Sequence, residues 1–119
     1  MCENRGISIV TGGPYNSGIL ASGAGPGAFY NYEPAPQAII DRVKAIEAVC
    51  QAHNVRMVDA AFQFPLRHPA HLAVIPGGQG VSEMKSILQA AAAASIPDSF
   101  WNELKSSGFL SENAPTKAL

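Results

Sequence analysis

The sequence has 119 residues, which is enough for one modest domain with its own core. Hydrophobic residues make up 47% of it and the formal net charge is −1. These values are ordinary for a globular protein, and no run of lysine or arginine suggests binding to nucleic acid or to an anionic membrane. No apolar stretch reaches the length of a transmembrane helix, and no signal-peptide pattern opens the chain, so a cytoplasmic location is the default expectation.

The first half is expected to contain one strand and two helices. Residues 7–11 are β-branched and apolar, and the Gly-Gly-Pro that follows ends them, which predicts a buried strand. Residues 21–36, rich in glycine, proline and aromatic residues, predict a long ordered loop. Apolar residues at three-to-four spacing then predict a helix over 37–52. A further helix is predicted over 57–68, with a kink at Pro65.

The second half repeats the alternation of strand and helix. We expect a strand at 71–75, helices at 82–94 and 97–106, and a loose tail over 109–119. Two apolar strands joined through helices indicate a parallel pair and an α/β fold. Both strands would have unpaired edges and apolar faces, so the chain has the pattern of a part of a larger sheet.

The cysteines and histidines carry little functional signal. Two cysteines make no disulfide framework, and we expect a buried thiol at Cys50 and an exposed one at Cys2. His53 is expected at a helix end, where a cation suits the dipole. His68 and His71 have no cysteine or acidic partner at ligand spacing, so no metal site is predicted.

The stretch IPGGQGVSEM, residues 75–84, places glycines between a strand and the start of a helix. Amide groups at a helix N-terminus carry positive charge outward, and glycine lets an anion approach the backbone. This pattern is typical of a phosphate site. Glycines that only turn the chain would give the same spacing, so the pattern leaves both interpretations open.

A family resemblance adds weight to the phosphate interpretation. Two stretches, GISIVTGGPYNSGIL at 6–20 and AAFQFPLRHPAHLAVIPGGQGVSEM at 60–84, resemble the C-terminal part of an aldo/keto reductase. The first, together with YNYEPAP at 30–36, is similar to the branch of bacterial sugar and pyridoxal dehydrogenases. The resemblance implies a TIM (β/α)8 barrel that binds NAD or NADP. On that mapping, residues 1–119 form a partial domain, the C-terminal fragment of the barrel, with its last two strands and their flanking helices.

The resemblance also implies which residues contact the cofactor pyrophosphate. They lie in the loops after the two strands: Gly12, Gly13, Tyr15, Asn16, Ser17 and Gly18 in the first, and Gly77, Gly78, Gln79 and Glu83 in the second. Gln79 stands where close relatives often carry arginine, which implies weaker phosphate binding.

Three further positions depart from the family pattern. Many members place an aromatic ring under the nicotinamide where this chain has Gly12, so that contact is absent or Tyr15 replaces it; Tyr15 as a packing residue is the alternative. Glu83 stands where members that use NADP tend to carry arginine, so a carboxylate there favours NAD over NADP, although it also suits the helix dipole. Ile87 replaces an asparagine that contacts adenine and is expected in the core.

No catalytic residue is predicted in this chain. The family's tyrosine, lysine, aspartate and histidine come from earlier strands of the barrel. We therefore expect a fragment of an NAD(P)-dependent oxidoreductase that acts on an aldose or a similar alcohol or aldehyde. Its aromatic loop residues Phe29, Tyr30 and Tyr32 would shape the substrate pocket or merely seal the barrel mouth.

Two alternatives stay open. One is a small self-associating α/β module that binds a nucleotide or nothing, in which a second copy covers the open strand edges. In a fragment, the missing N-terminal half would cover them instead. The other is a remnant without function.

Overall fold

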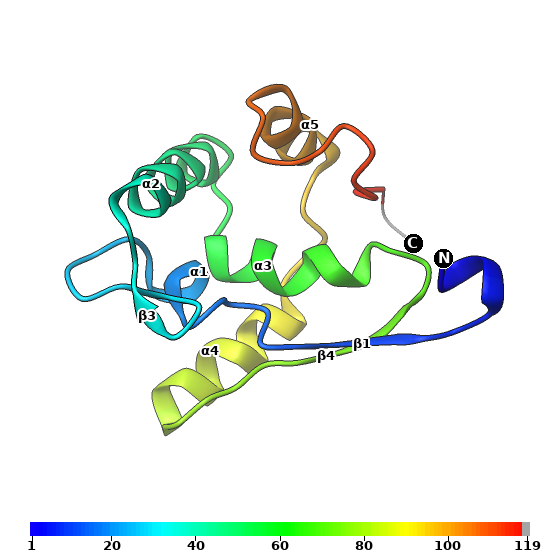
Figure 1. The fold of residues 1–119 in the computed structure, drawn as a ribbon, viewed down its shortest axis with the longest axis horizontal. Coiled ribbons are helices and arrows are strands. Elements are labelled where there is room, and N and C mark those ends of the chain that lie inside the picture. The colour runs from blue at the N-terminus through cyan, green and yellow to red at the C-terminus, as the bar shows by residue number, and fades with distance from the viewer. Residues whose placement is uncertain (118–119) are drawn as a thin grey trace.

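The computed structural model describes residues 1–117 (Figure 1). Its helices are a short 3-10 turn at Glu3–Arg5 and α1 Ile19–Ser22, α2 Gln37–Ala52, α3 Met57–Leu66, α4 Val81–Ala92 and α5 Asp98–Ser106. Its strands are β1 Ile9–Gly12, β2 Phe29–Tyr30, β3 Glu33–Pro34 and β4 His71–Ile75. Each predicted strand and helix is present, and no end is shifted by more than two residues. None of the described helices is both long and apolar enough to cross a membrane.

A pair of parallel strands organises the fold. β1 runs beside β4, with Val10 opposite Ala73 and Gly12 opposite Ile75. The chain passes between them through the hairpin β2–β3 and helices α2 and α3, and α3 lies along one side of the pair (Figure 1). The α/β class is confirmed. Within residues 1–117 the parallel sheet has two strands, and no closed barrel forms.

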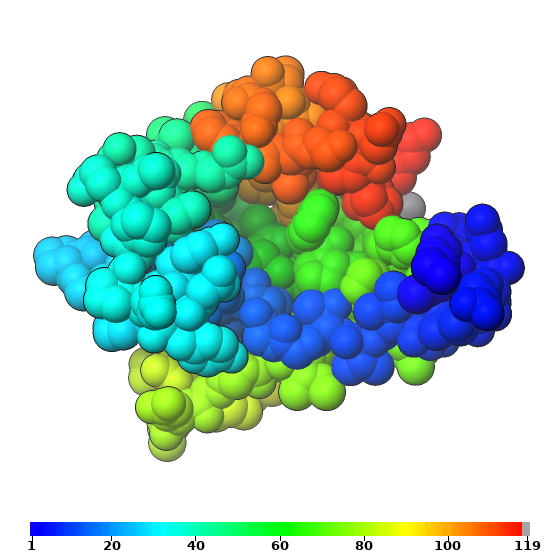
Figure 2. Space-filling view, in the orientation of Figure 1, coloured from blue at the N-terminus to red at the C-terminus, as the bar shows by residue number. Residues whose placement is uncertain are grey.

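The strand pair exposes much of its apolar surface, so the prediction that the strand over 7–11 is buried is wrong. Val10 is 49% exposed, Leu72 72% and Ile75 62%. β1, in blue, lies open on the face seen in Figure 2. Neither outer edge of the pair has a partner among the described residues. Burial of large apolar side chains is a main source of stability, so a sheet face this open is unusual for a complete domain.

The largest cluster of buried side chains lies among the helices instead. Phe100 and Trp101 of α5 are 0% and 2% exposed, and their rings meet edge to face at 5.0 Å. They pack against Val49 and Cys50 of α2 and against Ala60 of α3. Helix α3 contains Pro65 in its last turn and ends at Leu66.

Cys50 in this core is predicted to make stability depend on alkaline pH. Its side chain is 3% exposed, and burial, reinforced by nearby Glu47, raises its pKa from 9.0 to about 11. The unfolded thiol therefore ionises first, and the free energy of unfolding should fall as the pH rises from about 9 to about 11. Urea unfolding across that window should show this loss in the wild type and a smaller loss in Cys50→Ala.

Thiol labelling gives an independent check. Cys2 is only partly buried, and both cysteines are free. In native protein, Ellman's reagent should react with Cys2 well before Cys50, and the difference should vanish in denaturant. Equal native rates would contradict the burial of Cys50.

Two segments are more ordered than the sequence predicts. Residues 21–36 contain the hairpin β2–β3 rather than a loop alone. The predicted loose tail contacts the rest of the chain as far as Thr116: the guanidinium of Arg42 donates to the carbonyl of Phe109 at 2.9 Å, and that of Arg67 donates to the carbonyl of Thr116. Thr116 is 6% exposed. The last part of the predicted tail, residues 118–119, lies outside the described residues.

Candidate functional site

A cavity of about 690 Å³ lies where the carboxyl ends of β1 and β4 meet. Because the strands are parallel, the loops that follow them open at the same end of the sheet, which is where α/β proteins place their ligands. Both loops and the hairpin line this cavity: Gly13, Tyr15, Asn16, Ser17, Gly18, Phe29, Tyr32, Gly77, Gly78, Gln79 and Glu83. Of the residues predicted to contact a cofactor, the lining omits Gly12, which lies in β1 opposite Ile75.

The loop after β1 turns sharply and holds the hairpin. Asn16, Ser17 and Gly18 have φ values of 46°, 59° and 93°, all in the left-handed region. The Asn16 side-chain oxygen accepts from the amide of Asn31 at 3.1 Å, and the Ser17 hydroxyl accepts from the amide of Tyr32 at 2.8 Å. These two side chains therefore already bind the protein's own backbone.

The two adjacent glycines of the loop after β4 differ in their surroundings. A Cβ at Gly78 would lie 3.0 Å from the sulfur of Met84 and 3.1 Å from Cδ1 of Ile87, so this glycine allows close packing on α4. A Cβ at Gly77 would meet nothing within 4 Å. Gly77 thus leaves its backbone open to an approaching ligand, whereas Gly78 serves the fold.

Glu83 closes the start of α4. Its Oε2 accepts from the backbone amide of Gln79 at 2.6 Å, an arrangement like that of a capping box. The first amides of α4 have no intrahelical acceptor and face the cavity end of the helix. The site therefore combines open amide donors with one carboxylate.

Tyr15 is among the residues that line the cavity, but most of its surface is packed into the protein. It is 7% exposed and lies against Val58 and Ile87. Its hydroxyl is enclosed and has no hydrogen-bond partner among the described residues. Burial, with a smaller effect from the charge of Asp59, raises the pKa of this phenol. The packing interpretation therefore fits Tyr15, and Ile87, 8% exposed, is in the core as predicted.

A smaller cavity of about 270 Å³ adjoins the first and shares Tyr15, Gly18, Gly77 and Glu83 with it. Ser22, Ser82 and Ser86 line it as well, so its wall offers several hydroxyl groups. The two cavities together follow the glycine-rich loops from the hairpin to the first turns of α4.

The histidines lie away from these cavities. His53 pairs with Glu103 at 2.6 Å and joins the end of α2 to α5. The rings of His68 and His71 meet edge to face at 5.5 Å. Neither cavity includes any of the three in its lining, and no group of three metal-ligating side chains occurs within residues 1–117.

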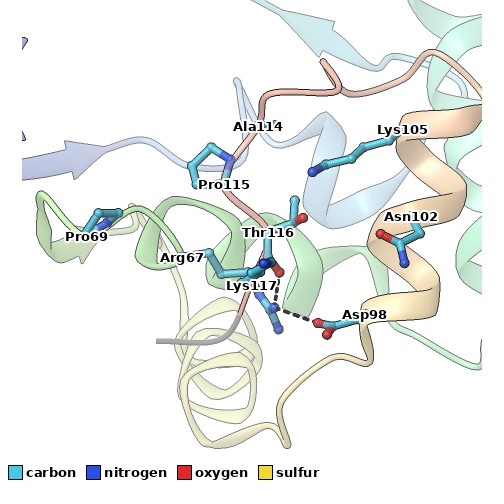
Figure 3. Close-up of a pocket in the computed structure, with 9 residues that line it drawn as sticks. All are labelled: Arg67, Pro69, Asp98, Asn102, Lys105, Ala114, Pro115, Thr116 and Lys117. Atoms are coloured by element: carbon cyan, nitrogen blue, oxygen red, sulfur yellow. Dashed lines mark hydrogen bonds and ion pairs between the residues drawn. The ribbon is translucent and has the colours of Figure 1, made fainter.

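A separate cavity of about 460 Å³ surrounds Arg67 (Figure 3). The guanidinium of Arg67 points toward the tail and the start of α5, where it donates to the carbonyls of Thr116 and Ile96 and lies 3.8 Å from Asp98. Lys105 also lines this cavity. Sequence reasoning gave no signal for this cluster, because its members are distant along the chain.

These features define an α/β protein whose glycine-rich loops gather at the carboxyl ends of two parallel strands beside a helix N-terminus. The sequence profile of the aldo/keto reductase family matches residues 1–108, and the chain belongs to that family.

Two curated relatives match most of the chain. It is 35% identical over 111 residues to a pyridoxal 4-dehydrogenase from Microbacterium luteolum, covering 93% of this chain and 32% of that protein. It is 34% identical over 104 residues to a D-threo-aldose 1-dehydrogenase from a Pseudomonas species, covering 87% of this chain and 31% of that protein. The chain thus spans about a third of the length of these relatives. No solved structure matches it.

Proposed function

We propose that this chain is the C-terminal part of a TIM (β/α)8 barrel of an NAD(P)-dependent oxidoreductase that acts on an aldose or a similar alcohol or aldehyde. In that barrel β1 would be the seventh strand and β4 the eighth. The names of the two relatives support the reaction class. The observation that carries the proposal is the cavity of about 690 Å³, which brings the two predicted cofactor loops together.

The residues around this cavity suit a dinucleotide. The open space at Gly77 and the free first amides of α4 fit a pyrophosphate. The carboxylate of Glu83 would repel a 2′-phosphate, which favours NAD over NADP. When bound, NAD would supply the hydride acceptor. The loops of this chain would hold the pyrophosphate and orient the cofactor.

The acid–base chemistry belongs, in this proposal, to the rest of the barrel. A catalytic tyrosine needs neighbours that tune its pKa and place its hydroxyl near the substrate. The lining of the cavity includes no lysine, arginine or histidine. The hydroxyl of Tyr15 is enclosed by protein. The chain alone would therefore bind cofactor and leave substrates unchanged.

Calorimetry and an activity assay would test this together. We expect titration of the purified chain with NAD to give measurable binding, and NADP to bind more weakly. No NADH should form with NAD and a panel of aldoses or pyridoxal. Turnover that copurifies with the chain would contradict the proposal that catalysis needs the rest of the barrel. Absence of NAD binding would contradict the proposed cofactor site.

Gly77→Ala should weaken NAD binding with little effect on folding. The added methyl group meets no protein atom within 4 Å, and Gly77 does not have a positive φ. It would instead occupy the space through which a phosphate reaches the backbone amides, and loss of one charge-assisted contact lowers affinity by about tenfold. Titration calorimetry and thermal melting of the variant would measure both effects.

Gly25→Ala is the matched control. Gly25 also has open space around it and no positive φ, and it lies outside both cavities of the candidate site. Its affinity for NAD should equal that of the wild type. Equal affinities in both variants would contradict the role proposed for Gly77.

Self-association is a second candidate function, and one observation favours it. Val81, Met84 and Leu88 follow one another at three-to-four spacing along α4, and they are 74%, 45% and 64% exposed. A second copy could cover these side chains. Sedimentation equilibrium would show a dimer if it does and a monomer if it does not.

A further inference from the structure

The turn of the hairpin β2–β3 has an unusual conformation for its sequence. Tyr30 pairs with Glu33, so Asn31 and Tyr32 form a two-residue turn. Both have positive φ values, 50° and 66°, which identifies a type I′ turn. Asparagine suits the first position of such a turn. The second strongly favours glycine, and a bulky tyrosine there is strained.

No burial of the ring offsets that strain. Tyr32 is 92% exposed, so its ring contributes almost nothing to the core. Tyr32 does line the cavity of about 690 Å³, as does Phe29 at the base of the hairpin. Residues with a strained backbone are often found where a protein contacts a ligand.

The site's own loop holds the turn in place. The amides of Asn31 and Tyr32 donate to side chains of Asn16 and Ser17. The same two residues line the cavity, and their own φ values are also positive. Their acceptor atoms therefore bind the hairpin, whereas the sequence predicts that these two residues contact the cofactor pyrophosphate.

We propose that Tyr32 places its ring against a flat ring of the bound nucleotide, and that Asn16 and Ser17 are positioning residues that hold its turn over the site. Tyr15 offers little open surface for this contact, since it is 7% exposed and packs against Val58 and Ile87. Tyr32 is the exposed tyrosine among the residues that line the same cavity. This inference rests on the proposed function, because it needs a nucleotide in that cavity.

Replacement of Tyr32 by glycine separates a ligand contact from a structural role. Glycine is the preferred residue at this turn position, so Tyr32→Gly should raise the melting temperature, by roughly 4 °C. It also removes the ring, and loss of one stacking contact should weaken NAD binding about fivefold or more. Tyr32→Phe keeps the ring and should bind NAD within about twofold of the wild type.

Ser17→Gly tests the positioning role. Glycine accepts the φ of 59° and lacks the hydroxyl that binds the amide of Tyr32. NAD binding should weaken in this variant. In the Tyr32→Gly background the same change should have no further effect, because residues that act through one another give non-additive effects.

Calorimetric titration of these variants with NAD, adenosine monophosphate and nicotinamide mononucleotide tests both the ring contact and the positioning role. The mononucleotide whose affinity depends on the ring at position 32 identifies the ring that Tyr32 contacts.

Equal NAD affinity in the wild type and Tyr32→Gly would overturn this inference and leave the cofactor site intact. A loss in Tyr32→Phe as large as in Tyr32→Gly would overturn the ring contact. An undiminished effect of Ser17→Gly in the Tyr32→Gly background would overturn the positioning role, and failure of the wild type to bind NAD would overturn the inference and the proposed function together.

Discussion

A Phe100→Ala variant is expected to lose about 3–5 kcal/mol of its free energy of unfolding. Phe100 is 0% exposed and lies at the centre of the helical core, between Trp101 and the end of α2. Its removal forfeits the transfer free energy of the ring and leaves a cavity that helices α2, α3 and α5 can only partly fill. Small domains are stable by only 5–15 kcal/mol, so this loss leaves little margin.

Urea unfolding followed by the fluorescence of Trp101, the single tryptophan, would measure this effect. Phe100→Leu keeps part of the side-chain volume and should lose less of the free energy of unfolding. It can therefore be measured even if Phe100→Ala fails to fold. Leu88→Ala is the control, because Leu88 is 64% exposed and should change stability by less than about 0.5 kcal/mol. A large loss in Leu88→Ala would show that the exposed face of α4 is covered in solution by another chain.

The regular elements could be predicted because their signals are local. The three-to-four spacing of Ile39, Val43 and Ile46 predicts α2, and its bounds agree with the structure. The β-branched residues after Gly6 and the apolar run ending at Ile75 predict the strands, and the intervening helices require the two to be parallel. The open face of the sheet also follows from the pattern, since both strands are apolar and the sequence offers them no third strand.

The hairpin and the contacts of the tail depend on residues that are distant along the chain, so the local sequence does not predict them. Asn31-Tyr32 lacks the glycine that marks a type I′ turn, so the turn is visible only through its bonds to Asn16 and Ser17. The tail is polar, and its order rests on Arg67, which is 49 residues from Thr116. Contacts over such distances are decided by the assembled fold.

The sequence predicts where the candidate site lies, but it does not predict what each residue does there. The glycine-rich loops and their meeting at one sheet edge follow from the sequence pattern together with the family resemblance. The different roles of Gly77 and Gly78 do not follow from the sequence, because they depend on how closely the side chains of α4 approach each glycine. Nor does the burial of Tyr15, whose surroundings come from α3 and α4.

Arg67→Met is expected to lose about 3 kcal/mol of the free energy of unfolding. The side chain of Arg67 is 6% exposed, and its guanidinium donates to the carbonyls of Thr116 and Ile96 and lies 4.8 Å from the centre of the Trp101 ring. Burial lowers the pKa of this group, and the charge of Asp98 opposes that effect. Two buried carbonyls would lose their donor, at about 1–3 kcal/mol each, and the cation–π contact would vanish.

The ion pair with Asp98 should matter much less than these bonds. The two charges lie 3.8 Å apart and the Asp98 side chain is 73% exposed, so solvent screens the pair. Asp98→Asn should therefore change stability by less than about 1 kcal/mol. Arg67→Lys should recover only part of the loss, because one ammonium group cannot reproduce a planar fork that reaches two carbonyls.

A chain that ends at Pro115 shows whether Arg67 acts by holding the tail. Without Thr116 the guanidinium loses one of its carbonyl partners, so Arg67→Met in the shortened chain should lose less than in the full chain. Guanidinium chloride unfolding would give the four free energies of this cycle. Equal losses in both chains would contradict the anchoring role and leave Arg67 as a link between α3 and the start of α5 through Ile96.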